Sequence, residues 1–432
     1  MLTRGTTTAR IAVLAACVLA TALVLAVIPG HRGWFDAGVY YGAVHHWADT
    51  GRLYDYVRPG TGYGFTYPPF AALCMLPMRL IGWHPAVAVG VVLSAAATAL
   101  LLHWTVGPIA RRRGWCRWYA FGLAACLCGL TNPVRDTFGF GQVNLLLVAL
   151  VFADRELTDR QSTDTRWQLL AGVGTGLAAA IKLTPALFIA HLLLTRRWRA
   201  AATATATALG ATGAGFLVAP EVSRQFWTAT LWNTDRVGDF ANMSNQSLQG
   251  LIARLGPQLP GRALWVAAAL AVLVVWVHRL RRAAAARDSL AAYSLTGIAC
   301  CLVSPITWVH HLVWMLPALV VLADAALSKT RRGGWLALCW LLQLLFSSGM
   351  VWLWRPDGRD LGTLLGGSAY ALLTLGLLLA VPIRPHPDEP EEPGRPAAPA
   401  RPATAAGPAE PAASAASARA PRPLGTHPAP VG

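Results

Sequence analysis

The chain has 432 residues, of which 55% are hydrophobic and only 13% are charged. A water-soluble domain of this length needs a charged surface, so the composition excludes a soluble globular protein and predicts an integral membrane protein. The net charge of +16 would indicate nucleic-acid binding in a soluble protein. Here the arginines stand in short clusters between apolar runs, which is typical of the cytoplasmic loops of membrane proteins.

The first apolar run, from about Ile11 to Ile28, is long enough to cross roughly 30 Å of hydrocarbon. Arg4 and Arg10 precede it and no small-residue cleavage pattern follows, so we expect an uncleaved first helix. Counting apolar runs against the arginine clusters predicts about twelve crossings, several shorter than the roughly 20 residues that a lipid-facing helix needs. The runs are residues 11–29, 85–106, 118–132, 141–154, 168–181, 184–195, 200–219, 263–280, 289–303, 309–326, 334–354 and 362–382.

Residues 30–68, between the first two crossings, form a predicted long first extracytoplasmic loop. Apolar and aromatic residues recur at helical spacing from Asp36 onward, which predicts a helix lying flat on the membrane and ending at Gly51. The apolar stretch from Phe70 to Trp83 follows two prolines and predicts a second juxtamembrane helix.

Asp36 is the first candidate for chemistry, because it follows the first apolar run directly among aromatic residues and glycine. Ionisable residues at the edge of a membrane are costly and need a reason. A carboxylate at this depth can take the proton of a sugar hydroxyl while a lipid-borne donor reaches it from the bilayer. The alternative is a structural acid that pairs with Arg32 or with a helix N-terminus. The pattern alone leaves both readings open.

Two basic residues are candidates for contact with an anion. Lys182 lies within an apolar stretch, where a lysine must pair, contact an anion such as a phosphate, or extend to the interface. Arg135, beside Asp136, is predicted on the outer side. The other basic residues lie mainly in the cytoplasmic clusters.

Further polar residues stand at the predicted outer ends of crossings. His310 and His311 can donate to a phosphate or a sugar hydroxyl, or serve as hydrogen-bonded packing residues. Gln142 and Asn144 can bind sugar hydroxyls or hold one helix to its neighbour. Tyr67 is a further candidate for substrate binding, although most aromatic residues in this loop fit an interfacial belt.

These motifs occur in an order that resembles glycosyltransferase family 87, the polyprenyl-phosphate-mannose-dependent alpha-1,2-mannosyltransferases of actinobacteria. The likeness covers about residues 10–380, and no single motif is specific by itself. The motifs are Asp36 to Tyr40, Gly51-Arg-Leu-Tyr54, Phe65-Thr-Tyr-Pro-Pro-Phe70, Gly141-Gln-Val-Asn144, Ile181-Lys-Leu-Thr-Pro185, Asn245-Gln-Ser-Leu248 and Ser304-Pro-Ile-Thr-Trp-Val-His-His311.

The resemblance implies an all-α, polytopic GT-C transmembrane bundle over residues 1–382, in the cell membrane, with an extracytoplasmic active site. It also implies Asp36 as the catalytic base of an inverting transfer of mannose to a lipid-linked or glycan acceptor of the phosphatidylinositol mannoside or lipomannan type. Such a transfer requires one base and cations for the departing phosphate. The chain has no Asp-x-Asp motif, so we expect neither a metal ion nor another cofactor. The expected partners are a polyprenyl-phosphate sugar, the acceptor and membrane lipids, without nucleic acid.

Two alternatives stay open. Another sugar, such as arabinofuranose or a different hexose, could travel on the same kind of carrier, because a few hydroxyl contacts decide sugar identity. A transporter of lipid-linked sugars would instead place polar residues and broken helices at the bilayer midplane in both halves. Residues 383–432 are rich in proline and alanine and predict a disordered cytoplasmic tail.

Overall fold

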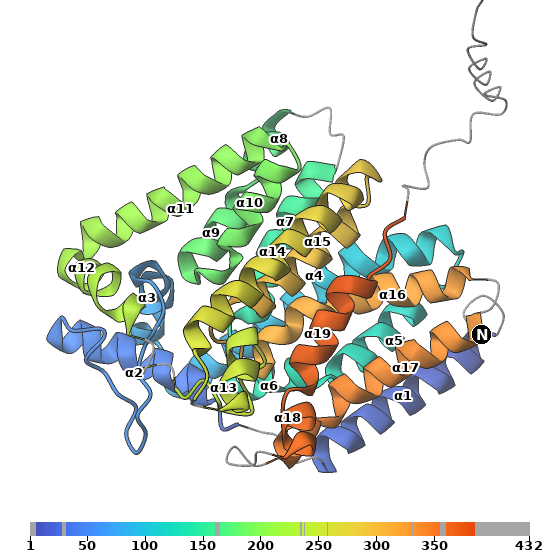
Figure 1. Cartoon of the computed structure of the whole chain (residues 1–432), viewed down its shortest axis with the longest axis horizontal. Helices are drawn as coiled ribbons and strands as arrows, with labels where there is room; N and C mark the ends of the chain where they lie inside the picture. The colour runs from blue at the N-terminus through green and yellow to red at the C-terminus, as the bar shows by residue number, and fades with distance from the viewer. Residues whose placement is uncertain are drawn as a thin grey trace, which may run out of the picture. The chain divides into compact units, whose positions relative to one another are not determined.

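The computed structural model describes residues 6–27, 32–159, 165–233, 236, 238–256, 258–329, 332–354 and 360–384. Within these ranges every named element is a helix, and only isolated β-bridges occur besides (Figure 1). The predicted tail lies outside the described residues except for its first two positions. The prediction of an all-helical fold is confirmed.

Five helical segments are long and apolar enough to cross a membrane. Two bent pairs raise that number to seven if each pair is one span: α6 with α7, bent by 115°, and α18 with α19, bent by 60°. The described chain is therefore that of a helical membrane protein. The five segments are α1 (Thr7–Val27), α4 (Trp83–Arg112), α11 (Trp198–Val218), α14 (Gly261–Ala285) and η5 with α16 (Val309–Ser328).

The other helices are shorter. They are α2 (Phe35–Thr50), α3 (Pro69–Met75), η1 (Leu76–Leu80), α5 (Arg117–Leu130), α6 (Asn132–Phe140), α7 (Asn144–Asp159), α8 (Thr165–Leu170), α9 (Val173–Ile181), η2 (Thr184–Ala186), α10 (Leu187–Leu194), α12 (Pro220–Thr228), η3 (Thr230–Trp232), α13 (Leu248–Leu255), α15 (Ser289–Val303), α17 (Arg332–Ser348), η6 (Met350–Leu353), α18 (Leu361–Gly367) and α19 (Ala369–Ala380).

The predicted count of twelve crossings is not confirmed. The predicted crossings at 168–181 and 184–195 illustrate the difficulty. They correspond mainly to α9, which has nine residues, and to α10, which has eight. Nine residues at 1.5 Å each extend only about 14 Å, less than half of the hydrocarbon thickness. The chain breaks between them at Lys182, and Pro185 starts the next turn. Apolar character continues through such breaks, so an apolar run need not be one continuous helix.

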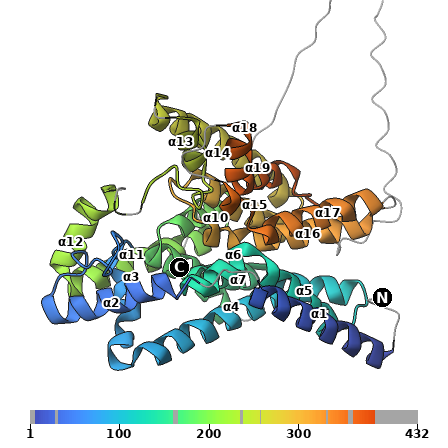
Figure 2. The ribbon, with the colours of Figure 1, turned by 90° about the horizontal axis from the view of Figure 1, so that it is seen from below.

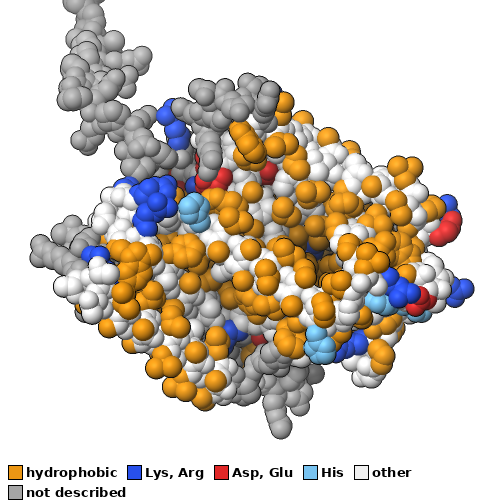
Figure 3. Space-filling view, turned by 180° about the vertical axis from the view of Figure 1, so that it is seen from behind, with side chains coloured by type: hydrophobic (Ala, Val, Ile, Leu, Met, Phe, Trp, Pro, Cys, Tyr) orange, Lys and Arg blue, Asp and Glu red, His pale blue; other side chains and the backbone are white. Residues whose placement is uncertain are grey.

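The buried core lies among the central helices α7, α15, η5 and α16. The helix α15 has twelve buried residues among its fifteen, and α7 packs against α4 and α9. Helices on the outside, such as α1 and α14, bury few side chains. Hydrophobic side chains cover much of the face in Figure 3, and charged side chains gather mainly near its margins. An apolar face of this extent is typical of a surface covered by lipid.

A second, smaller core joins the first loop to the bundle. It packs residues of α2, such as Tyr40, against Tyr54 and Phe65 of the following loop and against Phe226 of α12. The helices α2, α3 and α12 accordingly lie together at one side of the bundle (Figure 2). The prediction of a helix that Gly51 ends is confirmed, and the second predicted helix appears as α3 followed by η1.

Candidate active site

Asp36 stands in the first turn of α2, where the chain is tied to the end of α6. The residue before this helix, Trp34, has a left-handed backbone (φ 49°), and its N–H donates to the carbonyl of Gly139 over 2.9 Å. A carboxylate in the first turn is favoured by the partial positive charge of a helix N-terminus. The backbone therefore fixes where Asp36 lies relative to α6.

The corner between α6 and α7 brings an amide to this carboxylate. Gly141 ends α6 with φ +70°, and a Cβ added there would lie 2.6 Å from the Cβ of Ala37. Only glycine allows both this backbone and this close approach to α2. The next residue, Gln142, donates from Nε2 to Oδ2 of Asp36 over 2.7 Å.

Tyr67 continues the network on the other side of Gln142. Its hydroxyl donates to Oε1 of Gln142 over 3.0 Å and accepts from the hydroxyl of Tyr40 over 3.0 Å. It also accepts from Nζ of Lys182 over 3.2 Å. A phenol has one hydrogen to donate and two lone pairs to accept with, so these three bonds use its whole capacity.

Lys182, at the end of α9, holds the far side of the network. Its Nζ donates to Oδ1 of Asn144 over 2.9 Å and lies 2.8 Å from Nε2 of His311. Asn144 in turn donates to Gln142 over 3.4 Å and to the carbonyl of His310 over 3.3 Å. Three other segments of the chain, at Tyr67, Asn144 and His311, thus meet around one cation.

The two histidines have different surroundings. Nδ1 of His311 lies 3.2 Å from the backbone N of Trp308, and its Nε2 faces Lys182; a neutral imidazole can accept at only one of these two nitrogens. His310 is buried, and its ring lies 5.1 Å from that of Phe140 and 4.7 Å from that of His311. Neither ring nitrogen of His310 has a hydrogen-bond partner within the described part of the chain. Such a buried polar group has unused capacity to bind a ligand.

Burial separates the network into two sides. Gln142, Asn144 and His310 are buried, at 6%, 2% and 4% exposure. The groups able to exchange a proton or oppose a charge, Asp36 and Lys182, are only half-buried. The amides therefore act as a rigid backing for groups that a substrate could reach.

The surroundings of Asp36 raise its pKa. Burial of the carboxylate raises the pKa from 3.8 to about 6, against the opposing effects of the Gln142 hydrogen bond and of the Lys182 and Arg58 charges. Burial and the neighbouring Asp36 also raise the pKa of the Tyr40 and Tyr67 phenols, so both stay neutral at physiological pH. A carboxylate with a pKa near 6 is ionised at pH 7 and can still accept a proton usefully.

Arg32 and Arg135 both contact groups other than Asp36. Arg32 pairs with Asp136, with 3.4 Å between Nε and Oδ1, and not with Asp36. Arg135 donates over 2.7 Å to the carbonyl of Ser347 at the end of α17. None of its described contacts reaches the network of Asp36.

Sequence reasoning missed Arg58 and Tyr40. Arg58 lies in the connection between α2 and α3, and its guanidinium contacts the first turn of α2. One signal in the sequence could have identified Arg58. It is the only basic residue between Arg52 and the Phe65–Phe70 motif, and Pro59-Gly60 follow it directly. Tyr40 was part of a matched motif, and its hydroxyl contact could not be read from the pattern.

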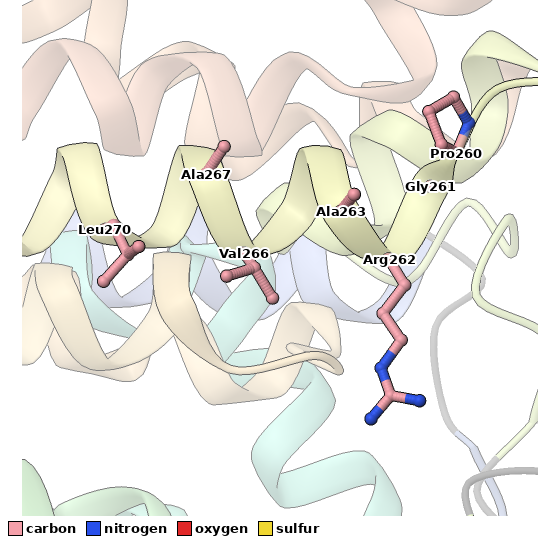
Figure 4. A pocket seen from close by; sticks show the side chains of 7 residues that line it. All are labelled: Pro260, Gly261, Arg262, Ala263, Val266, Ala267 and Leu270. Atoms are coloured by element: carbon pink, nitrogen blue, oxygen red, sulfur yellow. The ribbon is translucent and has the colours of Figure 1, made fainter.

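The described residues offer no competing site. They contain no group of three or more His, Cys, Asp or Glu side chains that could hold a metal ion. An apolar groove of about 730 Å³ runs along the first turns of α14, where Arg262 is the one charged side chain among those that line it (Figure 4). Its lining offers no carboxylate, histidine or hydroxyl for catalysis, so we assign no activity to it.

Comparison with known proteins identifies the family. The profile of glycosyltransferase family 87 matches residues 65–305, more than half of the chain. The chain belongs to glycosyltransferase family 87. No solved structure matches significantly.

Curated relatives of this family 87 chain come from mycobacteria. A polyprenol-phosphate-mannose-dependent alpha-(1-2)-phosphatidylinositol mannoside mannosyltransferase of Mycolicibacterium smegmatis is 36% identical over 71% of this chain and 70% of its own length. The corresponding phosphatidylinositol pentamannoside mannosyltransferase of the same organism is 32% identical over 82% of this chain and 86% of its own length. A phosphatidylinositol mannoside mannosyltransferase of Mycobacterium tuberculosis is 35% identical over 68% of each chain. The family 87 protein is therefore a glycosyltransferase of the mannosyltransferase type.

Proposed function

We propose that this enzyme transfers mannose from a polyprenyl phosphate carrier to a phosphatidylinositol mannoside or related glycolipid on the extracytoplasmic side of the membrane. The names of the relatives support the donor and the acceptor class. The single observation that carries the mechanism is the hydrogen-bonded line from Asp36 through Gln142 and Tyr67 to Lys182. It joins a proton acceptor to a cation through neutral groups.

The reaction follows from these positions. The Asp36 carboxylate takes the proton of the acceptor hydroxyl, whose oxygen forms a bond to the anomeric carbon of mannose. The bond from that carbon to the phosphate oxygen breaks at the same time, and the phosphate leaves with the electron pair. Lys182, with His310 and His311 beside it, opposes the charge that gathers on the phosphate. Attack opposite to the leaving group inverts the anomeric centre.

Replacement of Asp36 tests the base. Asp36→Asn keeps the size of the side chain and removes its basicity, so we expect transfer of labelled mannose to fall by about 10²- to 10⁴-fold, while binding of the donor persists. Asp49→Asn and Asp55→Asn, on the exposed side of the same region, are matched controls and should retain activity. Full activity of Asp36→Asn would refute the assignment.

The same assay separates the alternatives. Transfer of arabinofuranose or another hexose in preference to mannose would change the donor and leave the role of Asp36 intact. Movement of the lipid-linked sugar across vesicles without a glycosidic product would favour a transporter.

The proposed side of the membrane has its own test. In a variant without native cysteines, Asp55→Cys should react with a membrane-impermeant thiol reagent in intact cells, whereas Arg281→Cys should react only after permeabilisation. The reverse pattern would place Asp36 on the cytoplasmic side.

A further inference from the structure

Arg58 lies in a short hairpin that follows α2. Val57 and Gly64 form an isolated antiparallel bridge, and the N–H of Arg58 donates to the carbonyl of Tyr63 over 2.8 Å. This connection belongs to the blue loop that extends beyond α2 in Figure 1. The turn holds the backbone of Arg58 in a defined place, from which its side chain returns to α2.

The side chain of Arg58 packs onto the turn of α2 that carries Asp36. Its guanidinium lies 4.5 Å from the centre of the Phe35 ring and donates to the carbonyl of the same residue. A Cβ added to Gly38 would lie only 2.5 Å from Nη1 of Arg58, so the guanidinium fills the space that this glycine leaves open. Phe35 and Gly38 stand on either side of Asp36 along the helix.

The charges around Asp36 come from different directions. Lys182 acts from the end of α9 through Tyr67 and Gln142, and Arg58 acts from the hairpin. Both cations favour the ionised carboxylate, while the neutral phenols of Tyr40 and Tyr67 are the other titratable groups beside it. Lys182 is already engaged with Asn144 and His311 and is the proposed partner of the phosphate. Arg58 is thus the cation that acts on Asp36 from outside the lysine network.

We propose that Arg58 is a positioning residue for Asp36, one that packs onto the first turn of α2 and supplies a positive charge beside the carboxylate. The inference rests on the proposed function, in which Asp36 is the base. It assigns to the hairpin a role in the reaction that no sequence motif indicates. It also explains why a helix former such as alanine is absent from position 38.

The test compares pH profiles of kcat/KM for mannose transfer, measured with the full-length protein from about pH 5 to about pH 9. Removing a nearby positive charge makes the carboxylate harder to ionise, so in Arg58→Gln the acid limb should move up by about 1 pH unit. Activity should then be about tenfold lower than that of the parent at pH 5 and nearly unchanged at the alkaline plateau. Arg58→Lys restores the positive charge, so its acid limb should lie most of the way back to that of the parent enzyme.

A second variant reaches the same contact from the helix. Gly38→Ala should displace the guanidinium and move the acid limb in the same direction, although alanine is a better helix former than glycine and the protein should fold. The double variant should show no further shift, because both changes remove one contact. Gly90→Ala, in open space on α4, and Arg52→Gln, exposed in the same connection, are the matched controls.

The outcomes are distinct. Acid limbs of Arg58→Gln and Gly38→Ala that coincide with the parent would overturn the role of Arg58, as would a uniform loss of kcat at every pH. In either case the base assignment would stand as long as Asp36→Asn stays inactive. Activity in Asp36→Asn would instead remove the proposed mechanism itself.

Discussion

Gln142 connects Asp36 to Tyr67, and its amide can bond to both of them in only one orientation. The carboxylate of Asp36 needs a donor and the hydroxyl of Tyr67 needs an acceptor, and Nε2 and Oε1 meet them in that order. The amide cannot rotate without placing oxygen against oxygen. A site held in this way is organised before substrate arrives, which is how enzymes lower the cost of stabilising a developing charge.

The pH dependence of activity follows from the pKa of Asp36. This pKa is raised from 3.8 to about 6, and the reactive form of a base is the ionised one. On the acid side, activity should therefore fall through pH 6 and drop about tenfold per unit below it. Measurement of kcat/KM against pH checks this. An acid limb near pH 4 would mean that the carboxylate is not buried in the active enzyme.

Lys182 should affect the chemical step more than the binding of the acceptor. In Lys182→Met the side chain keeps its length and loses its charge, so kcat should fall by about 10²- to 10³-fold, as when one preorganised donor is lost. Lys329→Met, at the chain's other lysine, is the control and should retain activity. A variant with normal kcat would exclude contact of Lys182 with the leaving phosphate.

At the scale of elements, the bend between α6 and α7 depends on one glycine. Gly141→Ala would force an L-residue into the left-handed region, at a cost of about 1 kcal/mol, and would push its Cβ against Ala37. We expect Gln142 to withdraw from Asp36 and activity to fall at least tenfold, with little change in helix content. Transfer assays together with circular dichroism measure both. Gly129→Ala, in open space on α5, should be neutral.

The sequence predicted the parts of this site better than their connections. Helical spacing after Asp36 predicted α2, and Gly51 its end, because both are local properties. Asp36, Gln142, Asn144, Lys182 and Tyr67 meet in one network, whose catalytic roles stay predictions. Arg135 shows the limit, since its partner Ser347 is 212 positions away and no local pattern indicates it. The shortness of α9 and α10 was not predicted either, because hydropathy carries no information about a break in the backbone.

At the scale of the whole molecule, one buried carboxylate ties three distant segments together. Asp324 of α16 accepts from Arg112 and Arg113 at the end of α4 over 2.6 and 2.7 Å, and from Arg384 after α19 over 2.8 Å. The side chain of Asp324 is only 5% exposed, while the arginines are partly exposed. This cluster closes the end of the bundle away from the candidate site.

Loss of this carboxylate should reduce stability without altering the chemistry. Asp324→Asn leaves three arginines facing one another, so we expect a loss of about 2 kcal/mol, less than for a fully buried pair because water reaches the arginines. A lower melting temperature in detergent, with normal kcat in the surviving protein, is the expected result. Arg111→Gln, on α4 next to Arg112, is the control. An unchanged melting temperature would show that the cluster is not needed for stability.

The occupied oxygen of Asp36 has a consequence for stereochemistry. Because the Gln142 amide occupies one acceptor site of Oδ2, Oδ1 is the more open oxygen for an incoming alcohol. The trajectory of the nucleophile is then restricted by the resting protein, before either lipid has entered. A sugar offers several hydroxyl groups, and this restricted angle, together with the shape of the entrance, would decide which of them reacts. Regioselectivity would then depend on Gln142 as much as on Asp36.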